Sequence, residues 1–576
     1  MGAFFLYHKE TEISRSKVEE LYKKKGFCET QSFQIGEYYL MLYKKQLVGN
    51  DNFYKDGSNY IFVCGSLFYK GLGYKKSLES LLSDFTNNCI NSPELYGNYV
   101  ILYYNGEQKE LLFCIDPAFI KNVYFDINKK IISSDFLALI ETSPETYTLN
   151  HMAIIENLTT GHLISPDTYA NEIQKLDKKN INQIESGFPG IKVKNLRHAI
   201  DEQINGYEAA VEHANEQLSE YFESVKNLTN EFGANIGLTG GFDSRLLLMH
   251  ARKHLKRLIT NSFWRPNSRE YTNAKELAKA ADFDFVSFEE KHFEKPEKEE
   301  MLRKAYLFFD GQFRSQNNWD EEFNLPEYSA KIAANYLVGF HGCGGEQYRN
   351  ADRLIGKISF RTYIQFEWMF KQCENAFLDR KLQAAVYKNI KRKIMRLIDI
   401  SDNRIGLLEL KRIQNEIWNT ANRATRVNVL NQQQFYFAPF TEYQISHSAY
   451  SYVPFLKKSL SFQMEIMRRI DPELSAVKTN YGFNILEGEP FNSRLIPYIM
   501  KIIPRSIFYK LYFRVRRIQN KHLKLTDFHS NMNQYFHELG NKIDLIKLRN
   551  NINLGNGLTA CNFLLNYLKI SYLKEK

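Results

Sequence analysis

The stretch Asn235–Arg252, NIGLTGGFDSRLLLMHAR, decides how the second half of this chain folds. A short apolar run, Ile236–Leu238, leads into two glycines, and residues with helical apolar spacing follow from Leu246. This order of strand, tight glycine turn and helix start directs backbone N–H groups and a helix N-terminus toward an anion. The sequence therefore predicts a phosphate-binding turn at the end of a strand in an α/β domain.

The side chains of this turn favour a nucleotide with a bound cation. Gly240 and Gly241 let the main chain approach a phosphate without a Cβ in the way. The hydroxyl groups of Thr239 and Ser244 can donate to phosphate oxygens, whereas the Asp243 carboxylate suits Mg²⁺, because alone it would repel the phosphate. An ordinary glycine turn with a capping Asp or Ser is the alternative. We predict nucleotide contacts from Leu238, Thr239, Gly240, Gly241, Asp243 and Ser244.

The motif is not a Walker A loop, which requires Gly-Lys-Ser/Thr where this chain has Asp243-Ser244-Arg245. It resembles the Ser-Gly-Gly-x-Asp-Ser loop of ATP pyrophosphatases, enzymes that cleave ATP between the α and β phosphates, with Thr239 in place of the first Ser. The sequence leaves two roles open for Arg245, which are pairing with a phosphate and anchoring the helix to a neighbouring acid.

Composition indicates an ordinary globular protein. The chain has 576 residues, 44% hydrophobic and 25% charged, so two to four domains are expected. Its seven cysteines form no CxxC pair, which argues against disulfides or zinc and favours a cytoplasmic location. No apolar run is long enough to cross a bilayer, so no membrane insertion is expected. The net charge of +10 and the basic run Lys501–Lys524 are interpreted as solvated surface, so no nucleic-acid partner is expected.

Residues 1–192 are expected to form a layered α+β domain. Short runs of β-branched and aromatic residues alternate with turn signals, and a helical pattern lies between Gly71 and Phe85. Residues 145–195 are interpreted as the last strands of this domain and a linker. The predicted strands are the N-terminal stretch MGAFFLYHKE and Tyr60–Cys64, Asn98–Tyr104, Leu111–Asp116, Asn122–Ile127 and Lys130–Ser134.

Residues 193–576 are expected to form a second domain around a parallel sheet. An amphipathic helix, Asp201–Leu228, precedes the glycine-turn strand, and further strands alternate with helices. Parallel sheets bind ligands at the C-terminal ends of their strands, so Ser262 is a candidate adenine or ribose contact. Residues after about 355 read as mostly helical. The further predicted strands are Leu258–Phe263, Phe285–Phe288 and Tyr336–Phe340.

The stretch Leu95–Glu141, LYGNYVILYYNGEQKELLFCIDPAFIKNVYFDINKKIISSDFLALIE, resembles the middle of the glutaminase domain of asparagine synthetases in layout. The matching residues are Asp116-Pro117, Tyr124, Ser134 and Leu137. Two positions differ from the family pattern: Ile115 stands where the family has Arg, and Phe119 stands where it has Gly. The resemblance implies an αββα domain of the N-terminal-nucleophile-hydrolase type for residues 1–192 and an ATP-pyrophosphatase domain for residues 193–576.

The glutaminase chemistry of that family is expected to be absent. Gly2 stands where the family exposes a catalytic cysteine after removal of Met1, so no thiol is available there to attack an amide. The family's substrate-holding Asn-Gly-Glu-x-Tyr-Asn corresponds to residues 64–69, CGSLFY, in which its Asn is missing. Cys64 and Cys28 lie in hydrophobic patterns and are interpreted as inert buried thiols.

Two further stretches match the synthetase half. Residues 341–347, HGCGGEQ, correspond to a Gly-x-Gly-x-Asp segment whose Asp binds Mg²⁺, which implies that Glu346 shares an ion with Asp243. His341 and Gly342 would then line the adenosine side. Cys343 replaces a Glu or Tyr that helps to activate the attacking amine, and it is expected to shape the pocket more than to transfer protons. A glycine-rich turn with a surface Glu is the alternative.

The third stretch, Val477–Phe483, has the family's Lys followed by Gly-Phe, after Ala438–Glu442 in place of its Pro-Phe-Leu-Asp segment. Lys478 would therefore stabilise charge on the phosphate and acyl oxygens, and the alternative is a solvated lysine. The resemblance implies a ligase that uses ATP and Mg²⁺ to adenylate a small-molecule or peptide carboxylate, then joins the acyl group to an amine other than one from glutamine. An ammonia-using asparagine synthetase and a non-catalytic nucleotide-binding protein are the alternatives, and a homodimer is possible.

Overall fold

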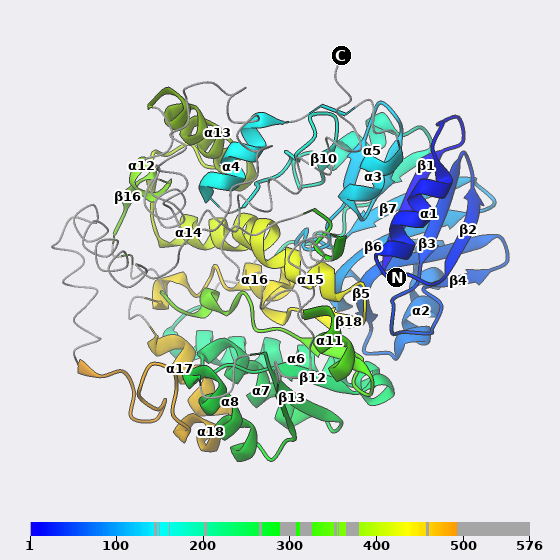
Figure 1. Cartoon of the computed structure of the whole chain (residues 1–576). Coiled ribbons are helices and arrows are strands. Elements are labelled where there is room, and N and C mark those ends of the chain that lie inside the picture. Colours follow the sequence, from blue (N-terminus) through cyan, green and yellow to red (C-terminus); the bar gives the residue numbers. More distant parts are fainter. Residues whose placement is uncertain are drawn as a thin grey trace, which may run out of the picture.

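The computed structural model describes residues 2–491, except 143–146, 149, 161, 201–203, 264–267, 288–306, 312–324, 351–353, 355, 365–379 and 457–459. The fold is mixed α/β, with two mainly antiparallel sheets from the first third of the chain and a parallel sheet from the middle (Figure 1). The predicted fold class is thus confirmed at the level of a mixed α/β protein with a parallel sheet. The basic run Lys501–Lys524 lies outside the described residues.

The two antiparallel sheets pack face to face. Their inner faces meet in an apolar core that includes Phe4 and Leu42 from one sheet and Phe62, Val100 and Phe113 from the other. The first sheet has the order β10-β8-β9-β1-β3-β2 and consists of β1 (Ala3–His8), β2 (Thr30–Ile35), β3 (Tyr38–Tyr43), β8 (Tyr124–Asp126), β9 (Ile131–Ser133) and β10 (Gln174–Lys175). The second has the order β11-β7-β6-β5-β4 and consists of β4 (Phe53–Asp56), β5 (Asn59–Tyr69), β6 (Leu95–Asn105), β7 (Glu110–Ile115) and β11 (Ile191–Val193).

Helices cover the outer faces of both sheets. Helices α1 (Arg15–Lys24) and α3 (Phe136–Thr142) share a core with Phe5, Met41 and Tyr43 of the first sheet. Helix α2 (Tyr74–Thr86) packs Leu78, Leu81 and Phe85 against the second sheet. The layers therefore run helix, sheet, sheet, helix. The shorter helices here are the 3₁₀ turn Ser92–Glu94, α4 (His151–Thr160) and α5 (Asn182–Gly187).

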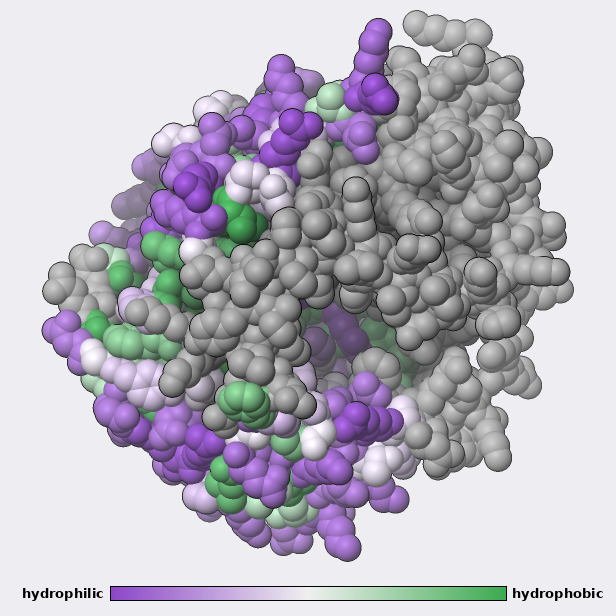
Figure 2. Space-filling model, turned by 90° about the vertical axis from the view of Figure 1, so that its left-hand side faces the viewer, coloured by the Kyte–Doolittle hydropathy of each residue, from purple (hydrophilic) through white to green (hydrophobic). Residues whose placement is uncertain are grey.

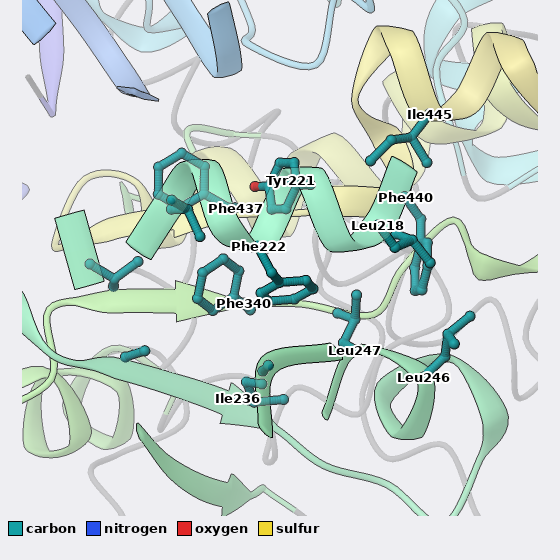
Figure 3. Close-up of a cluster of buried hydrophobic side chains, with 14 of the residues drawn as sticks. Leu218, Tyr221, Phe222, Ile236, Leu246, Leu247, Phe340, Phe437, Phe440 and Ile445 are labelled. Carbon is teal, nitrogen blue, oxygen red and sulfur yellow. The ribbon is translucent and has the colours of Figure 1, made fainter. Parts of the chain in front are cut away.

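The parallel sheet has the order β14-β13-β12-β15-β18, so β12 is the central strand and later strands of the chain are added on both sides of it. Its strands are β12 (Ala234–Gly237), β13 (Leu258–Ser262), β14 (Phe285–Ser287), β15 (Val338–Phe340) and β18 (Phe435–Phe437). Its helices are α6 (Tyr207–Phe232), α7 (Phe242–His254), α8 (Arg269–Ala280) and α11 (Leu325–Ala333). Figure 3 shows that Tyr221 and Phe222 of α6 pack over Phe340 and Phe437, beside Leu247 of α7. This core fixes the start of α7 at the end of β12.

The rest of the described chain is mostly helical, as expected after residue 355. It comprises α12 (Phe360–Tyr363), α13 (Arg380–Ile398), α14 (Leu407–Ile413), a π-helix (Gln414–Arg423), α15 (Ala424–Leu430), α16 (Tyr443–Ser448), α17 (Ser461–Ile470), α18 (Pro472–Ala476), the 3₁₀ turns Gly345–Tyr348, Pro439–Thr441 and Val453–Phe455, and the strand pair β16 (Ile358–Ser359) and β17 (Arg404–Ile405). Figure 2 shows mainly hydrophilic side chains on the described part of one face, with small scattered hydrophobic patches. No described helix has the length and apolarity needed to cross a membrane.

Two expectations about the first third of the chain are wrong, and strands β2, β3 and β4 were not predicted. Strand β2 is an edge strand whose residues are mostly polar and partly exposed, whereas β3 is apolar and mostly buried. Residues 145–195 contain two helices besides short strands, so they are not only strands and linker. Cys28 is exposed, because Phe27 turns into the core against Tyr22 and leaves its neighbour outside, whereas Cys64 is buried as expected.

A buried polar seam joins the antiparallel sheets to the parallel one. The backbone of Tyr436 in β18 donates from N to Ser66 Oγ (3.0 Å) and accepts at O from Asn98 Nδ2 (3.0 Å). Glu442 lies on the same seam and accepts from Gly97 N at 2.9 Å. Burial raises the pKa of Glu442 to about 8. The folded protein therefore keeps a proton on Glu442 at pH values where the unfolded chain releases it.

This proton makes stability depend on pH. The raised folded pKa of Glu442 contributes stability that is complete below its ordinary value of 4.5 and is lost as pH rises through about 8. Between pH 4.5 and about 8, the free energy of unfolding of the wild type is expected to fall by up to about 1.4 kcal/mol per pH unit relative to that of Glu442→Gln. Urea denaturation at several pH values checks this, with the exposed Glu473→Gln as control. If the free energies of unfolding of the wild type and of Glu442→Gln change with pH in parallel, the raised pKa of Glu442 is contradicted.

Candidate functional site

The first glycine loop lies between β12 and the N-terminus of α7. Leu238 N donates to Asn261 O of β13 at 2.7 Å, which fixes the loop to the sheet. Ser244 Oγ accepts from Thr239 N and contacts Thr239 Oγ1, both at 3.1 Å. Thr239 Oγ1 also accepts from Gly241 N at 3.2 Å. Among the described residues no side chain caps α7, so its first N–H groups remain available for an anion.

The second glycine loop, which follows β15, packs directly against the first. A Cβ on Gly342 would lie 2.8 Å from Ser244 N, and one on Gly345 would overlap the Asp243 carboxylate. Strands β12 and β15 are hydrogen-bonded neighbours in the sheet, so their C-terminal ends bring both loops to one edge. Glycine is needed at both positions because any side chain would separate the loops.

The two carboxylates expected to bind Mg²⁺ come together, and each forms an ion pair with an arginine. Asp243 accepts from both Nη atoms of Arg349, with Oδ2 2.9 Å from Nη2, and from Gln463 Nε2 at 2.9 Å. Glu346 Oε1 pairs with Arg423 Nη2, whereas its Oε2 is buried and has no hydrogen-bond partner among the described residues. Burial opposes ionisation of Glu346, but Arg423 and Arg349 outweigh it, so its pKa is lowered.

These acids do not form a complete metal cage by themselves. No group of three or more His, Cys, Asp and Glu side chains able to hold a metal ion occurs in the described part of the chain. The carboxylates nevertheless fit a cation that brings its own oxygen ligands, because among the described residues Glu346 Oε2 has no partner and Asp243 Oδ2 accepts a single hydrogen bond.

The third stretch is held beside the first loop by Arg245. This buried arginine donates from Nη1 to Leu474 O (2.9 Å) and Val477 O (2.6 Å), and from Nη2 to Lys478 O (2.8 Å). Asn480 N also donates to Gly240 O at 2.9 Å. Arg245 therefore has neither of the roles left open above, because its partners are backbone carbonyls. The Lys478 side chain is exposed next to this contact.

The remaining predicted residues lie around the same strand ends. His341 N donates to Phe437 O at 2.9 Å, and Cys343 N donates to His341 Nδ1 at 3.1 Å. Cys343 is half-buried and packs with Phe263 against an apolar cluster. Ser262 is buried at the end of β13. All of the predicted site residues are thus described, and they lie at the C-terminal ends of strands of the parallel sheet or, for Lys478, in the stretch that contacts the first loop.

Sequence reasoning missed the basic residues of the site. Arg349 and Arg423 contact the carboxylates, and buried Lys411 donates to Glu346 O (2.6 Å) and Arg349 O (2.7 Å). Arg349 directly follows the 3₁₀ turn Gly345–Tyr348, and this proximity to Glu346 was the one available signal for Arg349. Arg423 and Lys411 lie on helices far along the chain, where nothing in the sequence marks them.

The described residues around Gly2 leave only a small cavity. Its backbone N donates to Tyr43 O at 3.0 Å, and a Cβ at this position would overlap the ring of Phe27. Gly2 lines a cavity of about 20 Å³ together with Ser134, Asp310 and Gln432. That volume holds only one or two water molecules.

Gly2→Cys is therefore expected not to create a glutaminase. The new Cβ should destabilise the protein by about 1–3 kcal/mol, because Phe27 must move out of a packed core. Labelled glutamine incubated with the wild type and with the variant should yield no glutamate in either case. Gly49→Cys, at a position with open space, is the matched control for stability. Glutamate release at an enzymatic rate would contradict both this expectation and the loss of glutaminase chemistry.

Comparison with known proteins adds no relative. No protein-family model matches the chain, and no curated protein matches it either. The function is therefore inferred from the geometry of the loops and the motifs that they carry.

Proposed function

We propose that this protein is an ATP-dependent amide-forming ligase. In this proposal a substrate carboxylate attacks the α-phosphate of ATP, pyrophosphate leaves, and an amine then displaces AMP from the acyl group. The single observation that carries it is the contact of the Gly342–Gly345 loop with Asp243 and Ser244. This contact joins two anion-binding loops, two carboxylates and several cations at one edge of a parallel sheet, where α/β folds bind ligands.

Each group has a role that follows from its position. The N-terminus of α7 and the hydroxyl groups of Thr239 and Ser244 would bind the pyrophosphate. Asp243 and Glu346 would hold Mg²⁺, which neutralises phosphate charge when it is bound. Lys478 would stabilise negative charge on the acyl and phosphate oxygens, since its backbone is fixed by Arg245 while its side chain is exposed.

The finer fold assignment belongs to the same proposal. The face-to-face sheets covered by helices suit an N-terminal-nucleophile-hydrolase-like domain for residues 1–192. The sheet order around β12 suits an ATP-pyrophosphatase domain for residues 193–576. The amine would be ammonia, a second small molecule or an amine in the same substrate, because the Gly2 position offers no nucleophile.

The test has two parts. A MgATP-dependent rise in melting temperature examines nucleotide binding, and pyrophosphate release with panels of amino acids and short peptides examines catalysis. Binding together with carboxylate-dependent pyrophosphate release supports the ligase. Binding without turnover on any carboxylate favours a non-catalytic nucleotide-binding protein, and the absence of both would reject the proposal.

A further inference from the structure

The two carboxylates of the site are already neutralised by protein cations. Asp243 forms a two-pronged ion pair with Arg349, whose side chain is only 10% exposed, and Glu346 pairs with Arg423, whose side chain is 13% exposed. A bidentate guanidinium–carboxylate pair is among the stronger interactions between side chains. Neither carboxylate therefore presents an uncompensated negative charge to solvent.

More positive charge lies close behind these pairs. Lys411 is buried and donates to the backbone oxygens of Glu346 and Arg349, at 2.6 and 2.7 Å. Three cationic side chains, those of Arg349, Arg423 and Lys411, therefore lie around two carboxylates, and this cluster carries net positive charge. Such a surface attracts polyphosphate and repels a free metal cation.

The carboxylates nevertheless keep some capacity to bind a metal. Glu346 Oε2 is buried without a hydrogen-bond partner among the described residues, and Asp243 Oδ2 accepts one hydrogen bond, from Arg349. A carboxylate can accept at about four lone-pair positions. Each carboxylate thus keeps an acceptor position for a cation while the arginines stay in place, provided that the charge of the cation is offset by other ligands.

We propose that this site binds Mg²⁺ only as its complex with a nucleoside triphosphate, and that Arg349 and Arg423 enforce this selection. The arginines are positioning residues, which orient the metal-binding carboxylates and cancel their charge toward the free ion. The triphosphate supplies the negative charge and the oxygen ligands that the two neutralised carboxylates do not provide. This inference rests on the proposed function.

The experiment measures binding without catalysis. The full-length protein is titrated in thermal-shift and calorimetric assays with MgCl₂ alone, with a non-hydrolysable α,β-methylene ATP analogue in EDTA, and with the magnesium complex of that analogue. NaCl at matched ionic strength is the salt control. We expect no response to MgCl₂ up to about 10 mM and a clear melting-temperature rise with the complex. Binding of free Mg²⁺ to the wild type below that concentration overturns the inference, although the ligase proposal would survive.

Variants test the role assigned to the arginines. Arg349→Gln and Arg423→Gln each remove a positive charge that repels the free ion, so each should bind free Mg²⁺ at least about tenfold more tightly. Arg349→Lys keeps the positive charge and should stay unresponsive, as should Arg252→Gln on the outer part of α7. A glutamine variant that folds but gains no Mg²⁺ binding overturns the role of its arginine. If a glutamine variant does not fold, the titrations of the wild type and of Arg349→Lys still test the inference. Binding of free Mg²⁺ by either of these two proteins would contradict it. A wild type that binds neither Mg²⁺ nor the complex overturns the proposed function as well.

Discussion

Asp243→Asn is expected to lower pyrophosphate release by about 10²–10³-fold and to abolish the MgATP-dependent rise in melting temperature. The asparagine has nearly the same shape and can keep a hydrogen bond to Gln463, but it loses the charge that pairs with Arg349 and that binds the cation. The assays are pyrophosphate release with an accepted carboxylate and a thermal-shift titration with MgATP.

Loss of folding would imitate this result, so the stability of the variant is measured in parallel. Removing the charge leaves the mostly buried Arg349 without its ion-pair partner, at an expected cost of about 3 kcal/mol. Glu473→Gln, which removes an exposed carboxylate paired with Arg252, is the control for general charge effects. A folded Asp243→Asn protein that retains wild-type pyrophosphate release would exclude Asp243 from the chemistry.

The first glycine loop could be predicted because everything that defines it is local in sequence. A strand, two glycines and a helix start occupy consecutive positions, and the loop depends on backbone geometry that glycine permits. The second loop was predictable for the same reason, since β15 leads directly into it. The adjacency of the two loops followed from the rule that parallel strands end at one edge.

The partners of those loops could not be predicted, because they come from distant parts of the chain. Arg349 lies 106 residues from Asp243, and Gln463 lies 220 residues from it. Their contacts exist only after the helical region has packed on the sheet. The magnesium prediction therefore named the two acids but not the arginines that neutralise them.

The hairpin of β2 and β3 and the role of Arg245 were also not predicted, for two different reasons. The hairpin of β2 and β3 carried a usable signal, because Gly36 sits in its two-residue turn at a φ of +59°, but the polar residues of β2 hid the strand. The role of Arg245 carried no signal, since its acceptors are backbone carbonyls, which every residue has.

Arg245→Ala is expected to lower the free energy of unfolding by about 3–5 kcal/mol. The substitution leaves three buried or half-buried carbonyls, those of Leu474, Val477 and Lys478, without their donor and opens a cavity beneath α7. Each unsatisfied buried acceptor costs about 1–3 kcal/mol of stability, so the loss of three hydrogen bonds explains a large effect from one substitution. Urea denaturation of the full-length protein measures the loss.

Arg252→Ala is a closely matched control for this variant. Arg252 lies on the same helix and reaches the same segment, where it pairs with Asp471 (3.1 Å) and Glu473 (2.9 Å), but its side chain is 29% exposed. A partly exposed ion pair contributes about 0–1 kcal/mol. Arg245→Lys should recover only part of the loss, because one ammonium group cannot reproduce the guanidinium fork that reaches all three carbonyls. If Arg245→Ala and Arg252→Ala lose equal stability, the third stretch is held to α7 by something other than Arg245, and the placement of Lys478 beside the first loop loses its physical basis.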